Sequence, residues 1–281
     1  MKIQQLVRPT TLLESMSITL EPDTALYQHI IDKFSVVNGQ LSLNDLPNSV
    51  QSIGDMDSIA SHLNAQYRMI YIARSNGLKD LNTLPQNVGY VEVSVRECME
   101  LTNIDGLPNN IRSLELSRIP KLTNIDKVLA RSGGLTNLQV MLVGLTSIDL
   151  SNNSELQDVY LSCRDIRSIK GIKNLDKLEN VSIMSGTIDV GDLDGLRCKK
   201  FNLKTPNVNG DFNNITVVCD GISINATTFR KHVDGILKID GLKDIIIHGD
   251  IELHKAVSDV WNDQTSSIRA RMMKIIQIAS E

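Results

Sequence analysis

A short phrase recurs along the middle of the chain, and this repetition constrains the fold more than any other property of the sequence. The phrase reads LKDLN, LTNID, LTNID, LTSID and IRSIK, beginning at Leu78, Leu101, Leu122, Leu145 and Ile166. The steps between these starts are 23, 21, 23 and 21 residues. Self-similarity at about 20–29 residues is typical of stacked repeats, in which each unit buries its apolar side against its neighbours. The phrase therefore predicts an array of similar coils, and it favours recognition over catalysis.

A second phrase accompanies the first and has aliphatic residues at its first, fourth and sixth positions. It reads VGYVEV (88–93), IRSLEL (111–116), LTNLQV (135–140), LQDVYL (156–161) and LENVSI (178–183). Alternation at period 2 is typical of a strand, so we expect Val91 and Val93 in the core and Tyr90, Glu92 and Ser94 on the other face. Each phrase thus predicts one short strand per coil.

Together the two phrases resemble the leucine-rich repeat family in its short bacterial form. The clearest stretches are LTNIDGLPNNIRSLELS (101–117) and LTSIDLSNNSELQDVYLS (145–162). LPNS (46–49), LPQN (84–87) and LPNN (107–110) are similar to the LPx turn of some bacterial members, including secreted effectors. The resemblance implies an α/β solenoid: a leucine-rich repeat arc of about eight to nine coils, with parallel strands on the concave face and helical N- and C-terminal caps. The roughly 55 residues after the repeats are too few for the ubiquitin-ligase domain that some such effectors carry.

The chain departs from the family pattern at one position. The family usually has Asn or Cys three residues after the last aliphatic residue of the strand, where the side chain bonds backbone groups in the turn. Counting from the phrases above, that position is expected at Arg96, Ile119, Val143, Arg164, Gly186 and Pro206. The ladder of asparagines is therefore absent from the expected places, and we expect a less regular arc.

The sequence divides into three parts of one continuous domain. Residues 1–40 are expected to form an N-terminal helical cap, residues 41–225 the repeats, and residues 226–281 a C-terminal cap. The N-terminal cap would contain an amphipathic helix beginning near Pro22, and a further helix is expected at 57–64. The C-terminal cap would contain a short helix at 227–237, a strand-like stretch at 243–253 and one long amphipathic helix over 254–279.

Composition excludes several classes of function. A net charge of −4 gives no electrostatic reason to expect nucleic acid as a partner. No apolar run approaches 18 residues and the first residues lack a signal-peptide pattern, so neither a membrane span nor secretion is expected. Four scattered cysteines indicate reduced thiols and a cytoplasmic protein, with delivery into a host cell as a variant of that expectation. No cofactor is expected, and a monomer is slightly favoured over an oligomer.

Catalytic motifs do not stand out, and the chain is not expected to be an enzyme. It has no GxGxxG, GxxxxGK[ST], HExxH or GxSxG pattern. The one weak candidate for a metal site is the group His248, Asp250, Glu252 and His254, which a strand would place on one face. Because spacing alone is a weak signal and Gly249 can break the strand, we predict no metal.

The outward strand face is the candidate binding surface. Its central column is predicted to be Tyr71, Glu92, Glu115, Gln139, Tyr160, Ser182 and Asn202, flanked by one column with Met69, Tyr90, Ser113, Asn137, Asp158, Asn180 and Lys200 and another with Ala73, Ser94, Ser117, Met141, Ser162, Met184 and Lys204. Aromatic residues and Met are enriched at protein interfaces. The predicted protein-binding residues are Tyr71, Tyr90, Glu92, Glu115, Gln139, Asp158, Tyr160 and Met184.

These features predict a non-catalytic protein–protein interaction scaffold that binds a partner protein of unknown identity through its concave face. The alternative is a structural, assembly or host-interaction component that uses the solenoid edge or the C-terminal helix, whose RxRMMK stretch (269–274) lies beside an apolar stripe. A hydrolase or metal enzyme is the third class of function, with the least support from the sequence. The structural explanation of the two surfaces is that the polar face keeps the chain in solution and that the Met–Ile stripe covers the last repeat.

Overall fold

The computed structural model describes residues 18–19, 40–46, 48, 50–52, 68–81, 84, 89 and 91–281. The chain divides into two compact units, Met1–Leu145 and Thr146–Glu281. The predicted N-terminal helix, the predicted helix at 57–64 and Tyr90 lie outside the described residues, as does nearly all of the predicted cap at 1–40.

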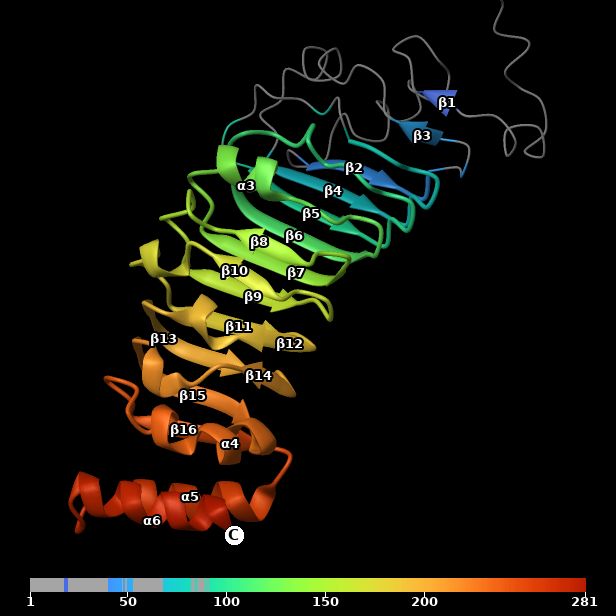
Figure 1. Cartoon of the computed structure of the whole chain (residues 1–281). Coiled ribbons are helices and arrows are strands. Elements are labelled where there is room, and N and C mark those ends of the chain that lie inside the picture. Colours follow the sequence, from blue (N-terminus) through green and yellow to red (C-terminus); the bar gives the residue numbers. More distant parts are fainter. Residues whose placement is uncertain are drawn as a thin grey trace, which may run out of the picture. The chain divides into compact units, whose positions relative to one another are not determined.

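The first unit contains five parallel strands that are adjacent in chain order (Figure 1). They are β2 (Gln40–Asn44), β4 (Met69–Ala73), β5 (Val91–Arg96), β6 (Ile111–Ile119) and β7 (Asn137–Val143). Two further short strands, β1 (Ile18–Thr19) and β3 (Val50–Ser52), pair with each other, and helix α3 spans Asp126–Arg131. Aliphatic residues at every second strand position point inward, and Leu41, Leu43, Ile70 and Ile72 are fully buried.

The second unit repeats this plan with β9 (Asp158–Ser162), β11 (Asn180–Met184), β13 (Leu196–Leu203), β15 (Val217–Asn225) and β16 (Asp244–His248). These strands are also parallel and adjacent in chain order. The return segments form two short parallel pairs, β8 (Ser147–Asp149) with β10 (Ser168–Lys170) and β12 (Thr187–Asp189) with β14 (Asn207–Asn209). Single 3₁₀ turns follow at Ile172–Asn174, Val190–Leu193 and Phe212–Asn214.

Each unit is therefore a parallel-strand α/β structure with a repeat-like arrangement, as the recurring phrases predict. Neighbouring strands are one repeat apart, since Ser94 lies beside Glu115 across 21 residues and Ser182 lies beside Asn202 across 20. Parallel strands with intervals this short leave no room for long crossover helices. The short 3₁₀ turns and α3 accordingly take the place of such helices.

Strand β5 is shifted relative to the sequence-based expectation. It runs over residues 91–96 rather than 88–93, and Val91, Val93 and Val95 are all buried. The phase of this coil is therefore two residues later than the VGYVEV phrase implies. Because a shift of two residues keeps the same side chains inside, the alternation itself cannot distinguish the two phases.

The strands of the first unit end in residues with left-handed backbone geometry. Their φ angles lie between 52° and 57°, and none of them is glycine: Asp45, Arg74, Glu97, Arg118 and Leu142. Such a conformation is uncommon for residues with a Cβ. Backbone hydrogen bonds hold it in place, because the Asp45 N–H donates to the Ala73 carbonyl and the Glu97 N–H donates to the Ser117 carbonyl. The first four side chains alternate in charge, and Asp45 pairs with Arg74 while Glu97 pairs with Arg118; the fifth, Leu142, is uncharged.

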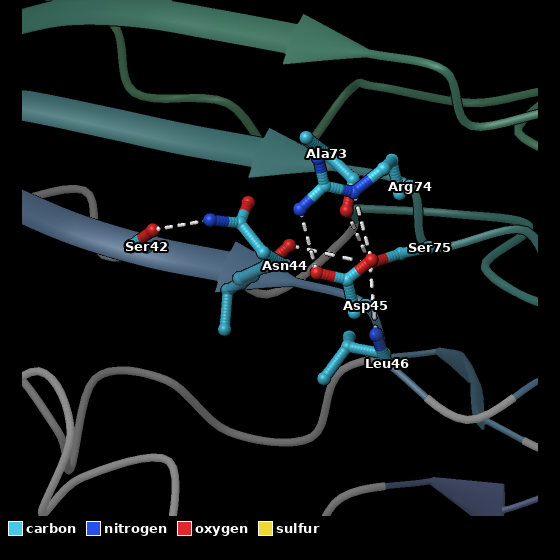
Figure 2. Close-up of polar contacts among 8 residues, drawn as sticks. Ser42, Asn44, Asp45, Leu46, Ala73, Arg74 and Ser75 are labelled. Atoms are coloured by element: carbon cyan, nitrogen blue, oxygen red, sulfur yellow. Dashed lines mark hydrogen bonds and ion pairs between the residues drawn. The ribbon is translucent and has the colours of Figure 1, made fainter.

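Immediately after this left-handed residue, the chain turns inward at a buried corner position. Figure 2 shows the corner at Ser75, whose side chain is fully buried. Its Oγ accepts a hydrogen bond from the Leu46 N–H at 3.3 Å and lies 3.2 Å from the carbonyl oxygens of Leu43 and Ala73. One hydroxyl thus connects two successive coils.

The corner positions correct the predicted ladder. They are occupied by Ser75, Cys98, Ile119 and Val143 in the first unit and by Cys163, Ser185 and Thr205 in the second, all of them buried. The expected positions Arg96, Arg164, Gly186 and Pro206 were wrong. The error at Arg96 follows from the phase of β5, and the other three arise because the corners of the second unit are one residue shorter. Small polar side chains and cysteines therefore do occupy much of the ladder.

The C-terminal end contains α4 (Ala226–Ile236), β16, α5 (Ile251–Trp261) and α6 (Ile268–Ser280). The single long helix expected over 254–279 was wrong. The helix is interrupted at residues 262–267, where the Asp263 carboxylate accepts hydrogen bonds from Thr265 and Ser266. Ser267 then caps α6, because its hydroxyl oxygen accepts a hydrogen bond from the Ala270 N–H.

Helix α5 packs beside β16, the last strand of its sheet. The Ile247 N–H donates to His254 Nδ1 at 3.3 Å, and Trp261 Nε1 donates to the Lys243 carbonyl oxygen at 3.0 Å. Side chains of one helix thus satisfy backbone groups at an edge that would otherwise be open to another strand.

Candidate protein-binding surface

A hollow lies on the open strand face of the first unit, over β4, β5 and β6. We call it the Tyr71 hollow. It has a volume of about 380 Å³ and is lined by Gln40, Met69, Tyr71, Glu92, Val93, Ser94, Arg96, Ser113 and Glu115. Three of the predicted binding residues, Tyr71, Glu92 and Glu115, therefore share one cavity.

Arg96 organises one side of the Tyr71 hollow. Its Nη2 lies 2.5 Å from Glu115 Oε2, its Nε donates to Ser94 Oγ at 3.1 Å, and Ser94 Oγ donates to the same carboxylate at 3.1 Å. The guanidinium also lies over the Tyr71 ring, 5.8 Å from its centroid. The hydrogen bond to Glu115 raises the pKa of Arg96. The side chains on this side of the hollow are thereby fixed in advance of any partner.

The register of β5 changes the predicted columns of the first unit. Tyr71 is level with Ser94, and Ser94 is level with Glu115 and then Gln139. Glu92 instead lies between Met69 and Ser113, in the neighbouring column. Sequence reasoning placed Ser94 in a flanking column and Arg96 in a turn. The alternation that continues through Val95 was the signal that could have placed both on this face.

The remaining predicted residues lie in the second unit, where the predicted central column and the column that contains Asp158 are confirmed. Tyr160 is level with Ser182 and Asn202, and Asp158 is level with Asn180 and Lys200. Asn180 Nδ2 donates to the Asp158 carboxylate at 2.6 Å, and Met184 is level with Ser162. The predicted binding residues are thus divided between the two units: Tyr71, Glu92, Glu115 and Gln139 in the first, and Asp158, Tyr160 and Met184 in the second.

The weak metal candidate does not form a single face. β16 ends at His248, Gly249 has a φ of +86°, Asp250 caps α5, and Glu252 and His254 lie on that helix. His248 Nε2 is 2.5 Å from Ser223 Oγ, and Asp250 pairs with Arg230 at 3.2 Å. Across the part of the chain that the structure describes, no group of three or more His, Cys, Asp or Glu residues is arranged to hold a metal ion.

None of the described helices is both long enough and apolar enough to cross a membrane. Comparison with protein families, with curated proteins and with solved structures finds no match to this chain. Its function must therefore be inferred from the chemistry of its own surfaces.

Proposed function

We propose that the chain is a non-catalytic, cytoplasmic scaffold of the leucine-rich repeat type, and that it binds a partner protein through its open strand face. The observation that carries this proposal is the Tyr71 hollow, with its network of Arg96, Ser94 and Glu115. Side chains fixed by one another and by strands lose little conformational entropy on association. A pre-ordered aromatic and charged surface is a suitable anchor for a protein partner.

The chemistry of the hollow favours a basic side chain on the partner. Glu92 is exposed and forms no ion pair with any described residue, whereas Glu115 is neutralised by Arg96. Met69 and Tyr71 supply apolar surface in the same cavity. A lysine or arginine of the partner would place its aliphatic part against these two residues and its charge beside Glu92.

The test is capture of binding partners by Glu92→Lys and Tyr71→Ala variants, with Asn137→Ala as the matched control. Asn137 lies on the same face, level with Ser113, but does not line the hollow. We expect the same partner to be captured by the native chain and the control and to be lost, or weakened by about tenfold or more, with Glu92→Lys. Glu115→Arg is a poorer probe because it would also break the Arg96 network. Equal capture by all four proteins would refute the proposal.

A second candidate function, assembly through the C-terminal helix, rests on a different observation. Ile268 and Met273 on α6 are 64% and 63% exposed, and Arg269 and Lys274 lie beside them. The combined variant Ile268→Ser and Met273→Ser leaves the buried residues of α6 in place. If light scattering shows that the native chain is an oligomer and this variant a monomer, assembly replaces partner binding as the preferred function.

A further inference from the structure

A second hollow lies on the open strand face of the second unit, over β13, β15 and β16. We call it the Gly221 hollow. Its volume is about 560 Å³, within the range of known small-ligand sites. It is lined by Lys199, Lys200, Phe201, Asn202, Asp220, Gly221, Ile222, Ser223, Lys243, Asp244 and Ile246.

The hollow exists because a glycine interrupts an outward column. Lys200, Gly221 and Asp244 are level with one another on adjacent strands. Gly221 does not have a left-handed φ, and a Cβ placed on it would meet only the Cβ and carbonyl oxygen of Asp244, at 3.7 and 3.9 Å. These are ordinary contact distances, so neither the backbone nor the packing requires glycine here. Glycine inside a strand weakens it, and it often marks a site that a ligand or another backbone approaches closely.

The charges around the gap form two groups. Lys199 pairs with Glu179 at 2.6 Å, and Lys243 pairs with Asp220 at 3.0 Å. Lys200 and Asp244, on either side of the gap, form no ion pair with any described residue. Two strand spacings separate their backbones by about 9–10 Å, which equals about three residues of extended chain.

An apolar group completes the site. Ile246 is 41% exposed, follows Asp244 by two positions on β16 and therefore faces the same side. The hollow thus offers a cation, an anion and an aliphatic surface within one cavity.

We propose that the Gly221 hollow binds a free tripeptide in extended conformation, whose negative terminal carboxylate and positive terminal amine lie about three residues apart and whose central side chain is aliphatic. The negative group lies at Lys200, the positive group at Asp244, and the aliphatic side chain at Ile246. An internal protein segment with oppositely charged side chains does not fit the same three positions, because in an extended chain the residue between two charged side chains points to the opposite face. The site is independent of the Tyr71 hollow, so Glu92→Lys leaves it unchanged.

The experiment titrates the full-length chain, labelled at isoleucine methyl groups, with three probes. The first is glycyl-leucyl-glycine with free ends, the second is the same peptide with both ends blocked, and the third is end-blocked glutamyl-leucyl-lysine. We expect the first probe to shift the Ile246 methyl signal, and the second and third probes to leave it unchanged. A shift with the third probe equal to or larger than that with the first would show that the hollow does not recognise the free ends, and it would contradict the proposal. No shift with any probe, or an equal shift with the uncharged one, overturns the proposal.

Four variants distinguish binding in the Gly221 hollow from nonspecific effects of the substitutions on the chain. Lys200→Gln and Asp244→Asn should each weaken binding by about tenfold, the effect of losing one charge-assisted hydrogen bond. Gly221→Val should fill the hollow and abolish binding while the melting temperature stays the same or rises. Lys204→Gln is the control, because Lys204 is exposed and lies just beyond β13 but does not line the hollow. If Gly221→Val binds the probe as the native chain does, the site is not this hollow.

Discussion

At the scale of single residues, the small polar side chains at the corners carry more of the structure than their size implies. A buried backbone group without a partner costs about as much as a lost hydrogen bond, so each turn between coils needs donors and acceptors from somewhere. At Ser75 one hydroxyl supplies both. In the second unit the hydroxyl oxygens of Ser185 and Thr205 lie 3.1 Å apart and connect two successive corners.

Replacing Ser75 by alanine should therefore lower the free energy of unfolding by about 1–3 kcal/mol, because the Leu46 N–H is left buried without its partner. Urea denaturation followed by circular dichroism measures this difference. The control is Ser113→Ala on the open face, for which we expect a change within about 0.5 kcal/mol. Equal stability of the Ser75 variant and the native chain would show that the corner hydroxyl is dispensable.

His232 provides a pH-dependent contribution at the same scale. The ring is 7% exposed and meets Phe212 edge-on at a centroid distance of 5.6 Å. Burial, with a smaller contribution from Lys231, lowers the pKa of His232 below its usual value of 6.5. Well above this pKa the imidazole is neutral in both the folded and the unfolded chain. As the pH falls through it, the unfolded state binds a proton first, so the stability of the folded state decreases.

We expect the urea midpoint of the native chain to fall between about pH 7.5 and pH 5.5, and His232→Gln to reduce that fall. His248→Gln is the companion variant, since the pKa of His248 is also lowered, chiefly by burial and then by Lys204. If His232→Gln leaves the pH dependence unchanged, the buried imidazole does not contribute to it.

At the scale of elements, strands were easier to predict than their register. The alternation of aliphatic residues identifies β5, β6, β7, β9 and β11, because an array with one buried face demands it. It leaves the phase of β5 open, because Val91, Val93 and Val95 all suit the core and a slip of two residues changes no face. Because of this difference of two residues, Glu92 lies outside the predicted central column, and Arg96 was not predicted to lie at the candidate site.

The corners and the C-terminal helices show two other limits. Asp45, Arg74, Glu97, Arg118 and Leu142 adopt a left-handed conformation, and the backbone N–H groups of the first three bond the neighbouring repeat. None of the five is glycine, so their residue types give no sign of this conformation. The break between α5 and α6, in contrast, was accessible. Asp263, Thr265, Ser266 and Ser267 form a polar cluster typical of a turn followed by a helix cap.

The contacts between α5 and β16 lead to a prediction about aggregation. Trp261→Phe keeps an aromatic side chain, although a smaller one, and removes the hydrogen bond to the Lys243 carbonyl oxygen, and we expect it to cost about 1 kcal/mol of stability. Combined with His254→Ala, it should also promote self-association through the exposed strand edge. Light scattering under native conditions measures the second effect. Ile251→Ser, at a position 86% exposed, is the control and should remain as dispersed as the native chain.

At the scale of the whole molecule, the four cysteines report on packing throughout the chain. All are free thiols; Cys98, Cys163 and Cys219 are buried and Cys198 is partly so. Burial raises the pKa of Cys198 and of Cys219 to about 12, and the proximity of Cys219 contributes to the value for Cys198. A thiol must lose its proton to react.

We therefore expect slow labelling of the native chain by a thiol reagent at about pH 8, and rapid labelling of all four cysteines in denaturant. A reducing agent should not change the melting temperature, since no disulfide is present to reduce. Fast labelling of one native thiol would identify a locally opening coil, and labelling of all four would contradict the packing described above.

The side chains of α5 that bond the edge of β16 also limit where repeats can be added or lost during evolution. A coil added beyond β16 would have to displace His254 and Trp261 from the backbone groups that they satisfy. A coil inserted between two existing strands would meet the same corner bonds on both sides and leave this end intact. Gain or loss of coils during evolution is thus expected inside the array, and the last strand and its two helices are inherited as one piece.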